Sequence, residues 1–450
     1  MNLYLMKQFL IAGCLYIGQM ISGYTMGWTA PIVLKLQDPE QTPFDEVITD
    51  AQASWVGSTM TIGVILGPYF SGYLANMIGR KPSLLIGGST CLLGLVIVCL
   101  ARQVAVLYVG RFIIGLGKGT MIVINLVYIG EMASTKIRGM LLTLTGFFTT
   151  LGTLLVYSVG PFVSYAVASW LAVAILGCYV VGIYFVVPES PMYLISTGKF
   201  KEARDILQLL GREDDVDNLL ATADEKPESN LTQLIEMFTI KINRKATFLI
   251  LSLNILQQMS GVIAVLFFAT TIFNQTGSNI EPHISTIIIG VTQVVAGSAA
   301  PFLVDRTGRK FLLLVSTFIC TLSLTTLGTY FYLYNNGLPA AESLSWISLV
   351  SLIVFFIGYN TGFGIIPNTF IGEMFTANVR SFGSTFTITI GWVFGFGVTT
   401  AFGYVWPAWG AAVTFWIFAS ACAVAFLFTL VFVPETKGKT LLEIQQMLDK

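Results

Sequence analysis

The stretch LANMIGRK at residues 74–81 occurs again, in related form, as LVDRTGRK at residues 303–310. Two more pairs follow in the same order along the chain: IGEM at 129–132 and 371–374, and VPES at 187–190 with VPET at 433–436. Three ordered matches are hard to obtain by chance, so they indicate an internal duplication. The two halves of the chain should therefore share one architecture.

The composition places this duplicated chain in a membrane. Hydrophobic residues make up 55% of the 450 residues, charged residues 11%, and the mean hydropathy is +0.77. So few charges cannot cover the surface of a soluble protein of this size. The apolar stretches are about 20 residues long, which suits a helix that crosses ~30 Å of hydrocarbon. They lack the period-2 alternation of a membrane barrel.

We therefore predict an all-α membrane protein with twelve transmembrane helices in two pseudo-symmetric six-helix bundles. The expected spans lie near residues 8–30, 52–75, 83–101, 106–129, 139–161, 166–187, 247–273, 283–304, 311–334, 343–371, 380–404 and 409–433. The predicted organisation is an N-terminal bundle at 1–187, a cytoplasmic linker with short amphipathic helices at 188–246, a C-terminal bundle at 247–433 and a cytoplasmic tail at 434–450.

The basic residues orient these spans. All Lys and Arg except Lys35, Arg102, Arg111 and Lys118 fall on one side of the predicted membrane. By the positive-inside rule that side is cytoplasmic, and it holds both termini. We expect a multi-pass protein of the plasma membrane, with the lipid bilayer as its surroundings and an oligomeric state that the sequence does not define.

Composition and motifs argue against other classes of protein. The formal net charge is zero, which gives no reason to expect a nucleic-acid partner. The six cysteines have no metal-type spacing, and neither a nucleophile with a base nor a phosphate loop is recognisable. We expect no enzyme activity, no metal and no cofactor.

Charged residues within the repeated motifs suggest a cytoplasmic gate. Glu131 and Glu373 lie at the membrane edge, each seven residues before an arginine, and a carboxylate there is costly unless it is paired. We predict an ion-pair cluster that links the halves when the inner side is shut; its members are Arg80, Glu131, Arg138, Glu189, Asp305, Arg309, Glu373, Arg380 and Glu435. The alternative is that these residues only mark loop boundaries and orient the chain.

Further motifs give the duplication a family resemblance. They are Gly110-Arg111, PESP at 188–191, QQMSG at 257–261 and PETKG at 434–438. Together with the repeats, they resemble the sugar porter family of the major facilitator superfamily, which includes facilitative glucose carriers and facilitated trehalose transporters. The resemblance covers nearly the whole chain. It implies the major facilitator fold, alternating access by rocking of two bundles, and a sugar held mid-membrane by hydrogen bonds.

A neutral sugar needs amides, hydroxyls and an aromatic surface. The expected substrate-binding residues are Gln257, Gln258, Gln293, Asn360, Asn368, Trp392, Thr145 and Thr25. The alternative for the Gln257-Gln258 pair is a hydrogen-bonded contact between helices. Trp392 aligns with the family's aromatic platform, but ordinary packing would explain it equally well.

Several positions depart from the pattern of the glucose carriers. Amides or other polar residues of those carriers are replaced at Thr145, Ile263, Phe267, Phe268, Asn360 and Gly391, and Gln293 stands in place of an Asn. Each missing hydrogen bond should cost ~1 kcal/mol or more. The substrate is therefore expected to be a hexose or a disaccharide such as trehalose, with glucose itself in doubt.

Facilitated diffusion is favoured over proton coupling. Proton-coupled relatives carry an Asp after Gly-Tyr in the first span, near the Arg of the fourth, whereas Thr25 stands here near Arg111 and cannot titrate. The sole histidine, His283, is assigned no role.

Lys118 lies in the same predicted span as Arg111 and is the main argument for another substrate. It is either internally hydrogen-bonded or it lines a cavity and attracts an anion. The alternatives to a sugar carrier are thus a carrier of another solute, such as an organic anion, and a sugar sensor that does not transport.

Overall fold

The computed structural model describes residues 3–134, 137–212, 230–278, 280–338, 343–439 and 441–449. These residues are almost entirely helical, and no strand occurs among them. Their contacts divide the chain into two compact units. The first unit is 1–28, 38–47 and 59–227, and the second is 29–37, 48–58 and 228–450. We describe each unit by itself.

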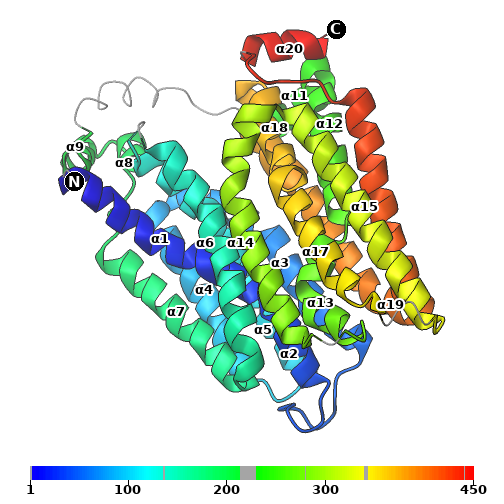
Figure 1. The fold of residues 1–450 in the computed structure, drawn as a ribbon. Coiled ribbons are helices and arrows are strands. Elements are labelled where there is room, and N and C mark those ends of the chain that lie inside the picture. Colours follow the sequence, from blue (N-terminus) through cyan, green and yellow to red (C-terminus); the bar gives the residue numbers. More distant parts are fainter. Residues whose placement is uncertain are drawn as a thin grey trace. The chain divides into compact units, whose positions relative to one another are not determined.

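The first unit is a helical bundle (Figure 1). Its helices are α1 (Leu3–Gly27), the part of α3 (Asp50–Met77) from Thr59 onward, α4 (Arg80–Leu100), α5 (Val104–Met132), α6 (Arg138–Val159), the short η1 (Gly160–Phe162), α7 (Tyr165–Phe185), α8 (Pro191–Ser196) and α9 (Phe200–Leu210). α1 packs against α6 and α7, and α4 packs against α5 and α7.

The second unit contains the later helices and two segments from early in the chain (Figure 1). Its members are α2 (Thr29–Leu36), the first turns of α3, α11 (Asn230–Thr239), α12 (Lys241–Met259), α13 (Val262–Asn274), α14 (Pro282–Thr307), α15 (Arg309–Asn335), α17 (Trp346–Gly358), η3 (Tyr359–Phe363), α18 (Ile366–Met374), α19 (Ala377–Phe432) and α20 (Leu441–Asp449). α15 and α12 pack along α19, and α13 packs against α2.

Three long apolar segments of the second unit are interrupted rather than straight. α12 and α13 meet at Gly261, whose φ of +78° is a left-handed conformation that suits glycine. α17 and α18 are joined by the π-helical turn η3. α19 is broken at Gly410, where φ is +81° and ψ is 168°. Such breaks at membrane depth are tolerated where the irregular backbone is buried in protein or faces a cavity.

Ten helical segments of the described residues are long and apolar enough to cross a membrane. One of them, Asn378–Phe432, contains the break at Gly410 and is long enough for two crossings. α3 is 28 residues long but more polar, and it is not among the ten. The predicted total of twelve spans stays a prediction, which would require α3 to cross once and α19 twice.

Candidate functional site

Three amide side chains lie on neighbouring turns of α12. Asn254 precedes Gln257 and Gln258 by three and four residues, a spacing that brings side chains to one side of a helix. Asn254 and Gln257 are buried. Gln257 Nε2 donates a 2.7 Å hydrogen bond to the backbone oxygen of Phe363 in η3. Its amide therefore joins two helical segments, as the contact-between-helices alternative expected.

Three other amide side chains of the second unit have buried atoms without a hydrogen-bond partner among the described residues. These atoms are Asn254 Nδ2, Gln258 Oε1 and, on α14, Gln293 Nε2. A buried polar atom without a partner costs roughly 1–3 kcal/mol, so native structures leave few of them. Unpaired amide atoms can be satisfied by hydroxyl groups, each of which both donates and accepts.

Two glycines of α19 pack closely against the amides of α12. A Cβ at Gly395 would lie 3.1 Å from Gln258 Oε1 and 3.0 Å from Ile263 Cδ1. A Cβ at Gly391 would lie 3.4 Å from the Asn254 Cβ. Trp392 lies between these glycines in the sequence and is half-buried. α19 thus presents hydrogen atoms rather than side chains to the amides of α12.

The remaining predicted residues of the second unit lie on the interrupted helix. Asn360 is half-buried in η3, and its Nδ2 donates to the Phe356 carbonyl at 2.9 Å. Asn368 is exposed on α18. The π-turn between them is held by Ser316 of α15, whose hydroxyl donates to the Gly358 carbonyl and accepts from the Phe363 N–H, both at 2.7 Å.

In the first unit, the two predicted threonines are buried and bonded to their own helices. Thr25 Oγ1 donates to the Ile21 carbonyl at 3.0 Å, and Thr145 Oγ1 donates to the Leu142 carbonyl at 2.6 Å. Two residues that the sequence reasoning did not select, Gln19 and Trp28, have buried donors, Nε2 and Nε1, without a partner among the described residues. Thr61 Oγ1 and Arg138 Nε of this unit are also buried without a partner among the described residues.

Arg111 and Lys118 connect α5 to the backbone of α1. Lys118 Nζ donates to the Ser22 carbonyl at 2.9 Å, and Arg111 Nη1 donates to the Thr25 carbonyl at 2.9 Å. The Arg111 guanidinium also lies 5.2 Å from the centre of the Trp28 ring, within the range of a cation–π interaction. Both cations are fully buried and have internal partners.

The repeated motifs form a charged cluster in the first unit. Arg80 donates to both carboxylate oxygens of Glu131, at 2.8 Å from Nη2 and 3.1 Å from Nε. The Ser190 hydroxyl donates to the same carboxylate. Glu189 Oε1 accepts from the backbone N–H groups of Arg80 at 2.8 Å and Lys81 at 3.2 Å. Glu189 thus caps the positive end of the α4 dipole.

The second unit repeats this cluster. Arg309 Nε donates to Glu373 at 3.1 Å, and Thr436 Oγ1 donates to the same carboxylate at 2.5 Å. Glu435 accepts from the backbone N–H groups of Arg309 at 3.0 Å and Lys310 at 3.1 Å, at the N-terminus of α15. The repeated sequence motifs therefore make the same kinds of contact in both units.

Glycine is needed at both of these turns. Gly79 and Gly308 each have a φ of +100°. A Cβ at Gly79 would lie 2.3 Å from Glu189 Oε2, and one at Gly308 would lie 2.9 Å from Glu435 Oε2. A side chain would therefore strain the backbone and displace the capping carboxylate.

Two predicted gate arginines have a different set of contacts. Arg138 Nη2 donates to the Ala133 carbonyl at 3.3 Å, and Arg380 Nη2 donates to the Phe375 carbonyl at 3.4 Å. The Nε atoms of both are buried and have no hydrogen-bond partner among the described residues. Asp305 belongs to α14, but its side chain lies outside the described set.

Among the predicted gate residues that the structure describes, Glu435 has a shifted pKa. Burial raises the pKa of its carboxyl. Hydrogen bonds from the backbone N–H groups of Lys437, Arg309, Lys310 and Phe311 lower this pKa by a larger amount in total. The net pKa lies below its ordinary value because these donors stabilise the ionised form.

Sequence reasoning could have found Asn254. It lies one turn before the Gln257-Gln258 pair inside an apolar segment, and an amide there is as unusual as the pair itself. No local signal marks Ser316, because a serine in an apolar helix usually bonds its own backbone. Its role depends on the irregular turn that packs against it.

Comparison with known proteins decides the family. The chain matches the family of sugar (and other) transporters over residues 11–448. It belongs to this family. The resemblance that the motifs predicted is thereby confirmed, and the members of this family are membrane transporters rather than enzymes.

Named relatives of this sugar transporter family member come from insects. Facilitated trehalose transporters Tret1 of Culex quinquefasciatus and Apis mellifera ligustica are 31% and 33% identical over 98% of this chain, and they are covered to 86% and 88%. The Tret1 of Anopheles gambiae is 32% identical over 99% of this chain. The chain spans only 56% of that relative's length.

Solved structures confirm the predicted fold of this family member. The inward open xylose transporter XylE from E. coli has a TM-score of 0.79 at 22% identity, covering 98% of this chain and 99% of that chain. A peptide transporter POT has a TM-score of 0.70 at 13% identity, covering 94% of each. The all-α major facilitator fold is therefore shared by carriers of chemically different solutes, so the fold alone does not identify the substrate.

Proposed function

We propose that this chain moves a neutral sugar across a membrane by facilitated diffusion, with alternating access to a central site. The observation that carries this proposal is the group of buried amide atoms without partners: Asn254 Nδ2, Gln258 Oε1 and Gln293 Nε2. A sugar would form hydrogen bonds with these amide atoms, and these bonds would break again when the sugar is released, as a carrier requires. No charge is needed for such recognition.

We propose a hexose or a disaccharide such as trehalose as the substrate. The trehalose transporters among the relatives support this choice. Gln258, Asn254 and Gln293 would hold the sugar, with Trp392, Asn360 and Asn368 along its path. In the first unit, Gln19, Trp28, Thr145 and Thr25 are separate candidates for contact with a sugar.

We propose that the two charged clusters form the cytoplasmic gate. Each carboxylate pair, Glu131 with Glu189 and Glu373 with Glu435, holds a helix start and an arginine in place. Arg138 and Arg380 have buried Nε atoms without a partner among the described residues, which makes them the members best suited to exchange contacts as access alternates. The positive-inside rule supports cytoplasmic termini, and we propose the plasma membrane as the location.

Uniport is supported by the environment of Thr25. Its hydroxyl donates a hydrogen bond to the backbone of its own helix and does not titrate. The Arg111 guanidinium donates to the Thr25 carbonyl and lies over the Trp28 ring. The argument for an anion rested on Lys118. Since its ammonium group already donates to the Ser22 carbonyl, an anion substrate has no specific observation in its favour.

Uptake by the purified protein in proteoliposomes tests the proposal. Radiolabelled glucose, fructose and trehalose should be compared, with and without a pH gradient. Saturable uptake of at least one sugar, unaffected by the gradient and lost in Gln258→Ala, is the expected result. Absence of uptake of all three by folded protein would refute a hexose or trehalose carrier, and dependence on the gradient would refute uniport.

A further inference from the structure

An apolar pocket lies between the two halves of α19, before and after the break at Gly410, and the end of α12. All of these segments belong to the second unit. The cavity volume of the pocket is about 110 Å³. Apart from Met259, none of its lining residues belongs to the sequence motifs or to the candidate sugar site.

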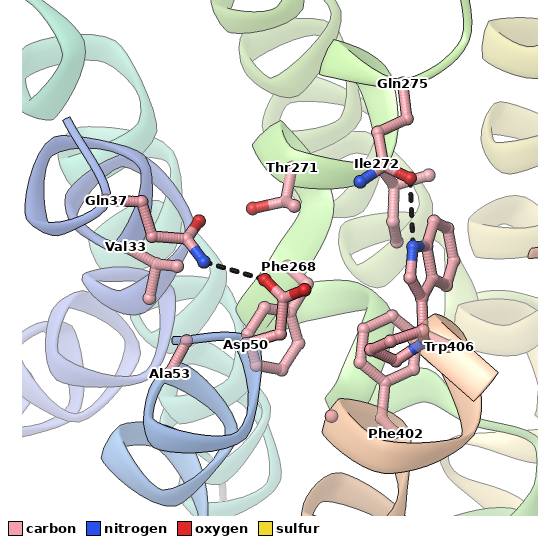
Figure 2. A pocket seen from close by; sticks show the side chains of 12 residues that line it. Val33, Gln37, Asp50, Ala53, Phe268, Thr271, Ile272, Gln275, Phe402 and Trp406 are labelled. Atoms are coloured by element: carbon pink, nitrogen blue, oxygen red, sulfur yellow. Dashed lines mark hydrogen bonds between the residues drawn. The ribbon is translucent and has the colours of Figure 1, made fainter. Parts of the chain in front are cut away.

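The floor of this pocket is formed by buried rings. Phe402 stacks on Phe268 with ring centres 4.9 Å apart, and it lies 5.0 Å from Trp406 (Figure 2). The Phe418 ring packs on Gly261 at the break between α12 and α13, where an added Cβ would lie 2.3 Å from it. Both floor rings are therefore held in place by packing on the side away from the pocket.

The lining side chains leave no hydrogen-bonding group for a ligand. Among the described residues that line the pocket, Thr414 has the one hydroxyl, and it donates to the Gly410 carbonyl at 2.9 Å. The other lining side chains contain no nitrogen or oxygen. Water in a cavity needs several polar partners, so apolar cavities stay dry and bind apolar molecules.

The mouth of the pocket opens onto an apolar surface. Three lining residues are exposed there: Ala401, Met259 at 36% and Ile417 at 38%. From Ile417, exposed apolar side chains continue at helical spacing along the second half of α19, through Val424 and Leu427. A ligand can therefore enter the pocket from this apolar surface.

Two crossings of α19 would place the pocket in the hydrocarbon of one leaflet. The segment Asn378–Phe432 is apolar and long enough for two crossings, and the break at Gly410 would then be the turn between them. Exposed Tyr404 and Trp409 lie beside this turn, as is typical of aromatic residues at a membrane–water interface. The lining residues that follow the turn by one to two helical turns would lie roughly 6–12 Å deeper.

We propose that this pocket holds a segment of one acyl chain of a bilayer phospholipid. Engineered apolar cavities on the order of 150 Å³ bind benzene, so a cavity of this size accepts a short run of methylene groups. A sterol fits less well, because its fused rings are rigid and cannot enter the pocket in part. The bound chain would lie against Phe418 and thus support the packing at the α12–α13 break. This site does not depend on which solute the protein transports.

Photolabelling of the whole protein tests the site. Purified protein in phosphatidylcholine nanodiscs, doped with a phosphatidylcholine that carries a diazirine on its acyl chain, is irradiated, and labelled residues are identified by peptide mass spectrometry. Ala401→Leu and Val405→Phe each enlarge a lining side chain and so fill the pocket. Ala166→Leu, the same change at an exposed alanine of α7 outside the pocket, is the matched control.

We expect wild type to be labelled at the pocket lining about fivefold more than at Val424 and Leu427, because an enclosed chain makes more contacts than one on an open surface. Ala401→Leu and Val405→Phe should remove this excess, and Ala166→Leu should leave it unchanged.

Equal labelling of the pocket lining and of Val424 in wild type would mean general lipid contact only, and it overturns the site whether or not the variants fold. An excess that persists in folded Ala401→Leu and Val405→Phe also overturns it. Labelling that disappears when cholesterol replaces part of the unlabelled phosphatidylcholine would assign the pocket to a sterol and likewise overturns the proposal.

Discussion

Gln257 Nε2 donates a 2.7 Å hydrogen bond to the carbonyl of Phe363, whereas the neighbouring Gln258 has a buried oxygen without a partner among the described residues. Two adjacent amides of one motif therefore have different surroundings. The first joins α12 to the π-turn of the interrupted helix, and the second is free to meet a ligand. This difference leads to the first prediction.

Gln258→Ala and Gln257→Ala should separate transport from stability. Gln258→Ala removes an unsatisfied buried oxygen, so uptake should fall at least tenfold while the free energy of unfolding stays within about 0.5 kcal/mol of wild type. Gln257→Ala leaves the Phe363 carbonyl without its donor and should lower the free energy of unfolding by about 1–3 kcal/mol. Thermal unfolding and uptake on the same samples check both; equal destabilisation by the two variants would contradict this division.

Ser316→Ala should loosen the π-turn. The hydroxyl accepts from the Phe363 N–H and donates to the Gly358 carbonyl, so its loss leaves the Phe363 N–H unpaired, while the Gly358 carbonyl keeps its bond from the Thr361 hydroxyl. We expect a loss of about 1–3 kcal/mol and a slower maximal uptake rate, because the turn joins α17 to α18. Ser420→Ala is the control, since that exposed serine donates to its own helix. An unfolding temperature identical in both variants would show that Ser316 does not hold the turn.

Gly395→Ala should crowd the Gln258 side chain. The new Cβ would lie 3.1 Å from Gln258 Oε1, so the amide must shift and a sugar must compete with a methyl group. The half-saturating concentration for uptake should rise roughly tenfold, which corresponds to a loss of ~1.4 kcal/mol in the free energy of sugar binding. Gly397→Ala on the same helix meets nothing within 4 Å and should behave as wild type. The same kinetics in both variants would argue against a sugar at this position.

Lys118→Met should leave sugar uptake within about twofold of wild type, because the ammonium group is already bonded to the Ser22 carbonyl and need not contact the substrate. The measurement is uptake of the sugar found to be transported, together with a set of organic anions. Anion uptake by wild type that disappears in this variant would restore the anion hypothesis.

Glu435 should make stability depend on acid pH. Its folded pKa lies below the ordinary value of 4.5, so the carboxylate stabilises the native state fully above pH 4.5. This contribution is lost as the pH falls through the lower folded pKa. The unfolding temperature of wild type should exceed that of Glu435→Gln at pH 7, and the difference should shrink below pH 4.5. Glu202→Gln, at an exposed position on α9, should show no such difference.

Much of the fold could be predicted from the sequence, and the reasons are local or compositional. A run of about 20 apolar residues must form a helix in lipid because its backbone groups have no other partners. The repeated Gly-Arg-Lys, Glu and Pro-Glu motifs carry their own capping geometry, since Glu189 and Glu435 bond backbone N–H groups at the helix starts of the same half. Membership of the sugar transporter family was predicted from these motifs and is confirmed.

The assignment of individual side chains in the candidate site needed the tertiary structure. Adjacent residues on an α-helix point about 100° apart, so whether Gln257 or Gln258 meets a carbonyl depends on where α18 and η3 lie. For the same reason Lys118 could be read as a cavity cation or as a bonded one until the Ser22 carbonyl was located. The surroundings of Asn254 and Ser316 also depend on segments distant in the sequence. The sequence by itself determined the helices, their repeat and the charged helix caps, because those depend on solvent and nearby residues; only the tertiary structure decided which polar groups are satisfied by the protein and which remain for a ligand, because that depends on the packing of separate helices.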